Sequence, residues 1–195
     1  MQTESTSTPE QPFRGIKLYF SGSIGGIEEA DYELPEQLTG YMQEKGATIL
    51  DPQVAISARR KPDEFRSAML GVQGISSEEW DQLSPQEKDL RIYRKDMSLV
   101  DQATHVVALV NGISFGVGME LQRALDKPTL GKNLTPILGL IHTDNIDELS
   151  YRMIRGAAQK YPHFQLKTYA SFEDATRAIH EFLAPPTQQI ARKRR

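Results

Sequence analysis

The sequence predicts an α/β fold in which helices cover both faces of a mainly parallel sheet. Short apolar segments alternate with segments of helical periodicity, and strands separated by helices need crossover connections, which make neighbouring strands parallel. Two glycine-rich loops, SGSIGG (21–26) and SFGVG (114–118), each follow an apolar run and lead into a predicted helix. The 195 residues, 38% of them hydrophobic, suffice for one domain of ordinary size with a hydrophobic core.

Five short apolar segments are predicted to form the strands, and they are Ile16–Phe20, Ala47–Leu50, Val106–Val110, Pro136–His142 and Phe164–Tyr169. Apolar residues spaced three or four positions apart predict helices over Glu33–Lys45, Pro85–Gln102, Val117–Leu125, Asp147–Ala158 and Phe172–Phe182. The helix from Pro85 has the clearest start. Ser84 and Glu87 form a capping box there, around a proline at the first helical position.

We expect one domain over residues 14–184, flanked by two tails. Residues 1–13 are rich in Ser, Thr, Pro and Gln, and residues 185–195 begin with a double proline and end in ARKRR. The segment 57–90 has no clean period, and we interpret it as an inserted excursion with short helices rather than a second domain. The basic cluster is interpreted as a solvated tail, with nuclear import or nucleic-acid contact as the alternative.

Composition argues against several classes of protein. The net charge of −3 disfavours a general nucleic-acid binder, and the absence of cysteine rules out disulfides and thiolate metal sites. The apolar stretches are too short to cross a bilayer. Metal-ligand spacing is absent among the four histidines, His105, His142, His163 and His180. We therefore expect a cytoplasmic protein, or a nuclear one through its basic tail, with no membrane association, no metal and no other cofactor.

The two glycine-rich loops predict an anion site. A strand that ends in small residues and turns at once into a helix leaves backbone N–H groups free at the helix N-terminus, where phosphate binds well. Both loops fall at the carboxyl ends of predicted parallel strands, which is where ligands of such sheets bind. SGSIGG matches neither GxGxxG nor a P-loop. The loops therefore predict a nucleotide or sugar-phosphate site.

Two carboxylates stand near these loops. Asp96 lies on the apolar face of the helix from Pro85, where an unpaired acid costs free energy. It either caps a neighbouring loop, pairs with an arginine or points into a cleft for catalysis. Glu120 lies in the first turn of the helix after SFGVG, where the helix dipole alone also favours an anion. Together the two carboxylates fit glycosidic bond chemistry.

Four segments resemble the nucleoside 2-deoxyribosyltransferase superfamily, and most closely its 2'-deoxynucleoside 5'-phosphate N-hydrolase branch. The segments are LYFSGSIGG, YRKDMSLVDQATHVVALV, SFGVGMELQRAL and MIRGAA. Their order, and the spacing between the aspartate and the SxGxGxE loop, match the family over most of the domain. The resemblance implies a flavodoxin-like fold, a doubly wound five-stranded parallel sheet of order 2-1-3-4-5 with helices on both faces. It also implies a homodimer with active sites near the interface and cleavage of an N-glycosidic bond.

The resemblance also implies roles for individual residues. Glu120 matches the nucleophile that forms a glycosyl-enzyme intermediate. Asp96 matches the acid that positions the nucleophile and sugar or handles the proton, and Tyr19 matches the aromatic residue that steers the glutamate. The matching substrate and phosphate positions are Gly22, Ser23, Ile24, Gly25, Gly26, Ser114, Gly116 and Gly118.

The sequence departs from the family pattern where the phosphate is held. Gly25 stands in place of an arginine, Tyr151 in place of a serine from the partner subunit, with Ser150 one residue off, and Gln53 in place of a histidine. The insert before Asp96 is also longer than the family usually carries. Cations that could supply the missing charge are Arg59, Arg60, Lys61, Arg152 and Arg155. The alternative for each of them is a solvated surface side chain.

These observations predict an N-glycosidase that acts on a nucleoside 5'-monophosphate, preferentially a 2'-deoxy one, and releases free base and sugar 5-phosphate. One alternative is a deoxyribosyltransferase that passes the sugar to a second base, since water and base compete for the same glycosyl intermediate. Another alternative is a nucleotide-binding module without activity. The presence of Tyr19, Asp96 and Glu120 argues against a module of that kind.

Overall fold

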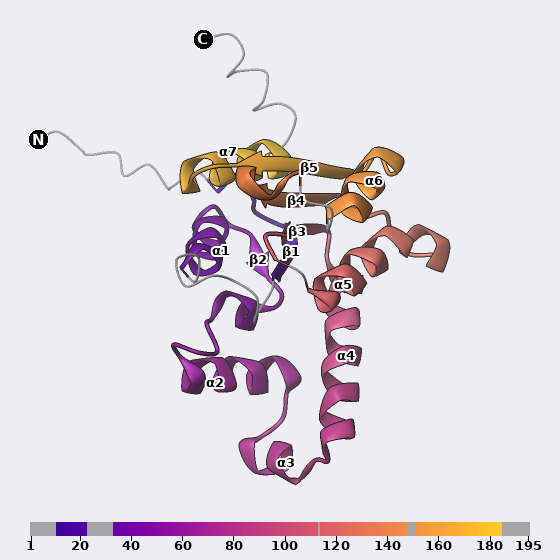
Figure 1. Cartoon of the computed structure of the whole chain (residues 1–195). Coiled ribbons are helices and arrows are strands. Elements are labelled where there is room, and N and C mark those ends of the chain that lie inside the picture. Colours follow the sequence, from indigo (N-terminus) through magenta and orange to yellow (C-terminus); the bar gives the residue numbers. More distant parts are fainter. Residues whose placement is uncertain (1–10, 23–32, 113, 148–150, 185–195) are drawn as a thin grey trace, which may run out of the picture.

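The computed structural model describes residues 11–22, 33–112, 114–147 and 151–184, and its centre is a five-stranded parallel sheet (Figure 1). The strands are β1 (Lys17–Gly22), β2 (Thr48–Ile49), β3 (His105–Leu109), β4 (Ile137–His142) and β5 (Phe164–Tyr169). They pair in the order β2-β1-β3-β4-β5, and every neighbouring pair is parallel. The predicted fold class and strand order are confirmed.

The strand β2 is shorter than the predicted segment, for a reason that lies in the sequence. Its pairing with β1 ends after the amide of Leu50 donates a hydrogen bond to the carbonyl of Leu18 at 2.9 Å. Pro52 follows two residues later, and proline has no amide hydrogen to continue the ladder. The chain turns there into the short helix η2 (Pro52–Ala55), with Asp51 as its N-cap.

The described helices are α1 (Leu34–Glu44), α2 (Pro62–Gln73), α3 (Ser77–Gln82), α4 (Pro85–Gln102), α5 (Phe115–Asp126), α6 (Arg152–Lys160) and α7 (Phe172–Leu183). Two further short turns of helix are η3 (Pro128–Leu130) and η4 (Thr143–Asn145). The bounds of α4 agree with the prediction. The prediction of a helix from Asp147 was wrong, because η4 and a turn follow β4 and α6 begins only at Arg152.

Helices cover both faces of the sheet, as predicted. On one face α1 and α7 bury a cluster with the sheet that includes Leu18, Phe20, Leu38, Met42 and Ile179. On the other face, α4 and α5 bury a second cluster with the sheet, which includes Tyr19, Leu99, Val106, Leu121 and Ile137. Side chains alternate along a strand, so Leu18 and Phe20 of β1 enter the first cluster and Tyr19 enters the second.

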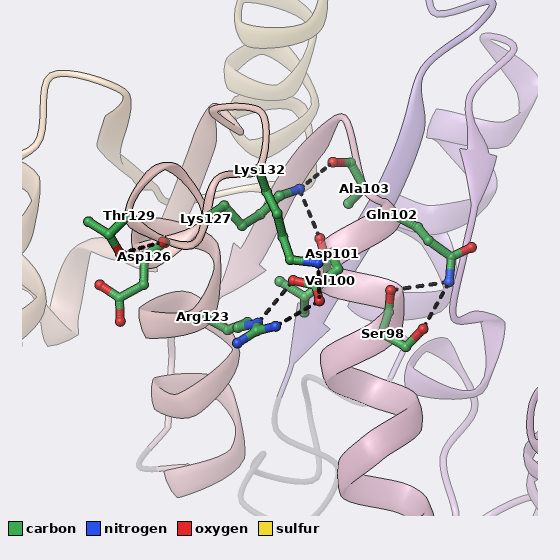
Figure 2. Close-up of polar contacts among 10 residues, drawn as sticks. All are labelled: Ser98, Val100, Asp101, Gln102, Ala103, Arg123, Asp126, Lys127, Thr129 and Lys132. Carbon is green, nitrogen blue, oxygen red and sulfur yellow. Dashed lines mark hydrogen bonds and ion pairs between the residues drawn. The ribbon is translucent and has the colours of Figure 1, made fainter.

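A polar cluster, which we call the α4–α5 clamp, fastens the end of α4 to α5 (Figure 2). The carboxylate of Asp101 accepts hydrogen bonds from Arg123 Nε at 2.9 Å and from Arg123 Nη2 at 2.8 Å. The buried Lys127 donates from Nζ to the carbonyl of Val100 at 3.1 Å and to that of Ala103 at 2.8 Å. A cation at the last carbonyls of a helix satisfies them and complements the helix dipole. The clamp thereby fixes the two helices that carry the predicted catalytic carboxylates.

The segment 57–90 contains the helices α2 and α3 and the start of α4. α2 ends at Gly74, which adopts the left-handed conformation with φ of 63° that glycine tolerates best. Ser76 and Glu79 then form a capping box that starts α3. α2 contacts η2 and α4, and Val72 packs against the buried cluster that contains Tyr19. In Figure 1, α2, α3 and the first turns of α4 extend away from the sheet on one side.

Candidate active site

The candidate active site lies at the carboxyl edge of the sheet, where β1 and β3 end and α5 begins. Ser114 is the N-cap of α5, and its hydroxyl accepts a hydrogen bond from the amide of Val117 at 3.4 Å. Gly116 and Gly118 lie exposed in the first turns of α5. A Cβ atom added at Gly118 would meet nothing within 4 Å. Because the described packing does not require glycine there, the backbone of this helix start stays open to a ligand.

Glu120 extends from α5 to the end of β1, where two buried hydroxyl side chains meet it. The hydroxyl of Ser21 donates a hydrogen bond to Glu120 Oε2. Burial raises the pKa of Glu120, whereas the hydroxyls of Ser21 and Tyr19 act in the opposite direction and favour the charged carboxylate. Ser21 was not predicted from the sequence, although the two-residue period of a strand places it on the same face as Tyr19.

Tyr19 is fully buried beneath the same carboxylate. Its hydroxyl has no partner of regular hydrogen-bond geometry among the described residues, although it lies close enough to Glu120 for the two groups to affect each other's titration. Burial, followed by the charges of Glu120, Asp96 and Asp51, raises the pKa of Tyr19 far above its usual range. Tyr19 is therefore a neutral phenol that can donate to Glu120.

Asp96 lies on α4 beside Glu120 and lacks the hydrogen bonds that Glu120 has. Its Oδ1 atom is buried and has no hydrogen-bond partner among the described residues. Burial, and then the negative charges of Asp51 and Glu120, raise the pKa of Asp96 to about 7. A carboxyl group with this pKa is a proton donor near neutral pH. The sequence left open that Asp96 pairs with an arginine. Among the described residues, no arginine forms an ion pair with Asp96.

A third carboxylate, Asp51, joins this cluster from the end of β2 and was not predicted from the sequence. It is 1% exposed and accepts hydrogen bonds from the amide of Gln53 at 3.3 Å and from Gln53 Nε2 at 3.1 Å. The signal that could have found it is an acidic residue directly after a predicted strand and before a proline, at the sheet edge where ligands bind. No group of three His, Asp or Glu side chains in the described ranges is arranged to hold a metal ion.

The predicted phosphate residues are only partly described. Ser23, Ile24, Gly25 and Gly26 lie outside the described residues, as does Ser150. Gly22 is the half-buried last residue of β1. Tyr151, at the position of the family's partner-subunit serine, is buried as the N-cap residue of α6.

The candidate cations are placed as follows. Arg60 and Lys61 form exposed ion pairs with Glu33, at 3.7 Å, and with Glu36, at 2.9 Å. These pairs stand at the start of α1, the helix that follows the first glycine-rich loop. Arg155 donates a hydrogen bond to the carbonyl of Ile146. Arg59 and Arg152 are both exposed. Exposed ion pairs contribute little free energy, so the insert's cations can exchange their carboxylate partners for a phosphate at small cost.

Large apolar side chains are exposed on the helices of this half of the molecule. Phe115 and Met119 of α5 are 87% and 52% exposed, Met153 of α6 is 84% exposed, and Tyr93 of α4 is 49% exposed. In Figure 1 these three helices follow one another along one side of the sheet. A set of exposed apolar side chains close to a ligand site is typical of a surface that another molecule covers.

Comparisons with known proteins agree with this geometry. The chain is 34% identical to human 5-hydroxymethyl-dUMP N-hydrolase over 174 residues, covering 89% of this chain and 83% of the human protein. It is 33% identical to the same enzyme from Rattus norvegicus, with 89% of each chain covered. Among solved structures, the CMP N-glycosidase BcmB of Clostridium botulinum matches with a TM-score of 0.50, covering 85% of this chain and 98% of BcmB. At 14% sequence identity, that likeness concerns the fold.

No protein-family model matches the sequence. Among the described helices, none is long and apolar enough to cross a membrane. The identity to the human and rat enzymes extends over most of both chains, and it confirms the resemblance that the sequence motifs indicated. The chain therefore belongs to the 2'-deoxynucleoside 5'-phosphate N-hydrolase branch of the nucleoside 2-deoxyribosyltransferase superfamily, a group of enzymes that cleave N-glycosidic bonds.

Proposed function

We propose that this enzyme hydrolyses the N-glycosidic bond of a 2'-deoxynucleoside 5'-monophosphate and releases free base and sugar 5-phosphate. The observation that carries the proposal is the difference between its two carboxyl groups. Glu120 accepts a hydrogen bond from Ser21, whereas Oδ1 of Asp96 is buried without a partner in the described residues. Environments that separate the pKa values of two neighbouring carboxyl groups assign one as the charged group and the other as the acid. The 5-hydroxymethyl-dUMP activity of the human and rat relatives supports a deoxynucleotide substrate.

In the first step, the carboxylate of Glu120 attacks the anomeric carbon of the sugar. A bond forms between this carbon and a glutamate oxygen, while the bond to the base nitrogen breaks and its electron pair leaves with the base. Asp96 gives its proton to the departing base and becomes a carboxylate. Ser21 and Tyr19 hold the attacking oxygens in place with their hydroxyl groups.

In the second step, water resolves the intermediate. Asp96, now charged, takes a proton from the water, whose oxygen bonds to the anomeric carbon. The bond between sugar and Glu120 breaks, and its electrons return to the glutamate as a carboxylate. Both carboxyl groups thus regain their starting states, and no cofactor is needed. A second base in place of water would give the transferase reaction instead.

The 5'-phosphate is proposed to bind at the helix start of α5 and at the first glycine-rich loop. The open backbone at Gly116 and Gly118 and the N-cap hydroxyl of Ser114 support this placement. In the family, an arginine at the position of Gly25 supplies positive charge for the phosphate. We propose that the insert, residues 57–90, supplies this charge instead. Its cations pair with exposed carboxylates at the start of α1, directly after this loop in the chain.

We also propose a homodimer whose two-fold interface covers the exposed apolar side chains of α4, α5 and α6. Phe115 and Met153, more than four-fifths exposed, support an interface that runs beside the active site. Light scattering at assay concentrations should give twice the mass of the chain. Phe115→Asp together with Met153→Asp should give monomers with lower activity, while a fully active wild-type monomer would contradict the dimer.

A substrate panel tests the function directly. The enzyme is incubated with deoxynucleoside and ribonucleoside monophosphates and the matching nucleosides, with and without an acceptor base, and the products are separated by chromatography. Free base and sugar phosphate without acceptor support the hydrolase, whereas a new nucleotide formed with the acceptor supports the transferase. Glu120→Gln keeps the shape but removes the negative charge, so turnover should fall by orders of magnitude while substrate binding survives. Unchanged turnover would refute the assignment of the nucleophile.

A further inference from the structure

Asn111, two residues after the end of β3, extends the sheet with its side chain instead of its backbone. The amide of Val110 donates a hydrogen bond to the carbonyl of Leu140 at 2.8 Å, and in a regular parallel ladder the amide of His142 would then donate to the carbonyl of Val110. The amide of His142 donates instead to Asn111 Oδ1, at 2.8 Å. Because the side chain provides this last rung of the ladder, the backbone after Val110 can leave the sheet toward α5.

Asn111 also binds two further elements at the carboxyl edge of the sheet. Its Nδ2 group donates a hydrogen bond to the hydroxyl of Tyr169, the last residue of β5. Its backbone carbonyl accepts a hydrogen bond from Asn145 Nδ2 of η4 at 3.2 Å. His142 and Tyr169 are partners in the sheet, and the centres of their rings lie 5.4 Å apart. Asn111 therefore connects the chain that leaves β3 to the ends of β4 and β5 and to η4.

The proposed nucleophile is held by other contacts. Glu120 accepts a hydrogen bond from Ser21 of β1, and the α4–α5 clamp fixes α5 one turn further along the helix. Ser114, the N-cap of α5, instead follows Asn111 by three positions, so the two residues lie at most about 11 Å apart. A change at Asn111 should therefore displace the start of α5 more than it displaces Glu120.

We propose that Asn111 is a positioning residue that fixes the start of α5 for the 5'-phosphate of the substrate and takes no part in cleavage of the glycosidic bond. This inference rests on the proposed function, in which Ser114 and the backbone after it bind the phosphate. Asparagine suits the position because its side-chain amide is both acceptor and donor. The oxygen binds the amide of His142, and the nitrogen binds the hydroxyl of Tyr169.

The test compares KM with kcat in Asn111→Leu. Leucine is similar in size to asparagine and forms no side-chain hydrogen bonds. KM for the monophosphate that the substrate panel identifies should rise about tenfold or more, because a displaced helix start loses a charge-assisted hydrogen bond to the phosphate. kcat should stay nearly unchanged, since the contacts of Glu120 remain. Calorimetry with 2-deoxyribose 5-phosphate, the proposed sugar product, should show an affinity that falls by a similar factor.

Two further variants make the result specific. Thr104→Val is the matched control, because the hydroxyl of Thr104 fastens the opposite end of β3 to β1. This hydroxyl accepts a hydrogen bond from the amide of Lys17 at 3.0 Å and donates one to its carbonyl at 3.1 Å. Thr104→Val should change neither KM nor the affinity for the sugar phosphate. Tyr169→Phe removes the hydroxyl that Asn111 binds, so it should raise KM by a smaller factor, and it also tests the inference if Asn111→Leu does not fold.

The outcomes separate the inference from the proposed function. If the wild-type enzyme cleaves none of the nucleotides, the proposed function is overturned. If it is active, and Asn111→Leu and Tyr169→Phe keep its KM and its affinity for the sugar phosphate, the role of Asn111 is overturned. A lower kcat with unchanged KM, or an equal rise of KM in Thr104→Val, would show a merely structural role and would also overturn the inference.

Discussion

Replacing Asp96 by asparagine should abolish activity and, at alkaline pH, make the protein more stable. In the folded enzyme the pKa of Asp96 is raised from 3.8 to about 7 by burial and by its two acidic neighbours. A raised pKa means that the folded state binds the proton more tightly than the unfolded chain does. The stabilisation is therefore present below about pH 4 and is lost as pH rises through about 7. Above that pH, the wild type carries a charge that disfavours folding.

The size of this penalty follows from the shift. A difference of about three pH units, at about 1.4 kcal/mol per unit, gives an upper bound of about 4 kcal/mol. Water that reaches the partly buried carboxyl group reduces it, and we expect about 1–3 kcal/mol. For a chain of this length, that corresponds to a rise in Tm of about 3–10 °C for Asp96→Asn at pH 8. The rise should be far smaller at pH 4, where Asp96 is protonated in the folded state and about half protonated in the unfolded chain.

The assay is urea or thermal unfolding of wild type and Asp96→Asn at pH 4, 6 and 8, at one protein concentration, since assembly affects apparent stability. Asp89→Asn, on the exposed side of the same helix, serves as the control and should show no such pH-dependent difference. Equal effects of Asp96→Asn at all three pH values, or a loss of stability at pH 8, would refute the reasoning. Wild-type activity in Asp96→Asn would refute its role as the acid.

Two further predictions concern the nucleophile and the phosphate. Ser21→Ala removes a hydroxyl donor from the Glu120 carboxylate, so the acid limb of kcat/KM should move to higher pH by about one unit, which a pH profile measures. A limb that stays in place would contradict a hydrogen bond that favours the charged nucleophile. Neutralising the insert's three cations together should lower kcat/KM about ten- to a hundredfold on monophosphates, and leave any nucleoside activity nearly unchanged. These cations are Arg59, Arg60 and Lys61. If the triple variant had the same kcat/KM as the wild type on both monophosphates and nucleosides, the insert would be excluded as the phosphate site. Arg152 and Arg155 would then be the next candidates.

Hydrophobic periodicity was sufficient to predict the strands and most helices of this chain, because each buried segment has the apolar pattern of its element. The capping box at Ser84 even located the start of α4. The failures have local causes. Pro52 stops the pairing of β2, and the turn that follows η4 still includes Asp147, where the helical pattern had predicted the start of the helix now seen as α6. The spacing of apolar residues reveals neither a missing amide hydrogen nor a short turn of helix.

Only those residues of the candidate site that lie in family motifs could be predicted from the sequence. Glu120, Asp96 and Tyr19 followed from the family resemblance, and the structure brings all three together. Ser21 and Asp51 were not predicted, because nothing in their sequence neighbourhood shows that they face Glu120 and Asp96. That information comes from the register of β1 with β2 and β3, which brings together residues far apart in the chain.

Three acidic side chains at one sheet edge repel one another, and the fold must hold them in place. Asp96 and Glu120 lie on different helices, so once Asp96 is ionised, above about pH 7, the repulsion acts to separate α4 from α5. The α4–α5 clamp opposes this separation close to both residues, since Asp101 and Arg123 follow Asp96 and Glu120 by five and three positions in the chain. Its two parallel hydrogen bonds fix orientation as well as distance. The stability lost in bringing the carboxyl groups together is thus offset by a second polar cluster, one helical turn away, that takes no part in the chemistry.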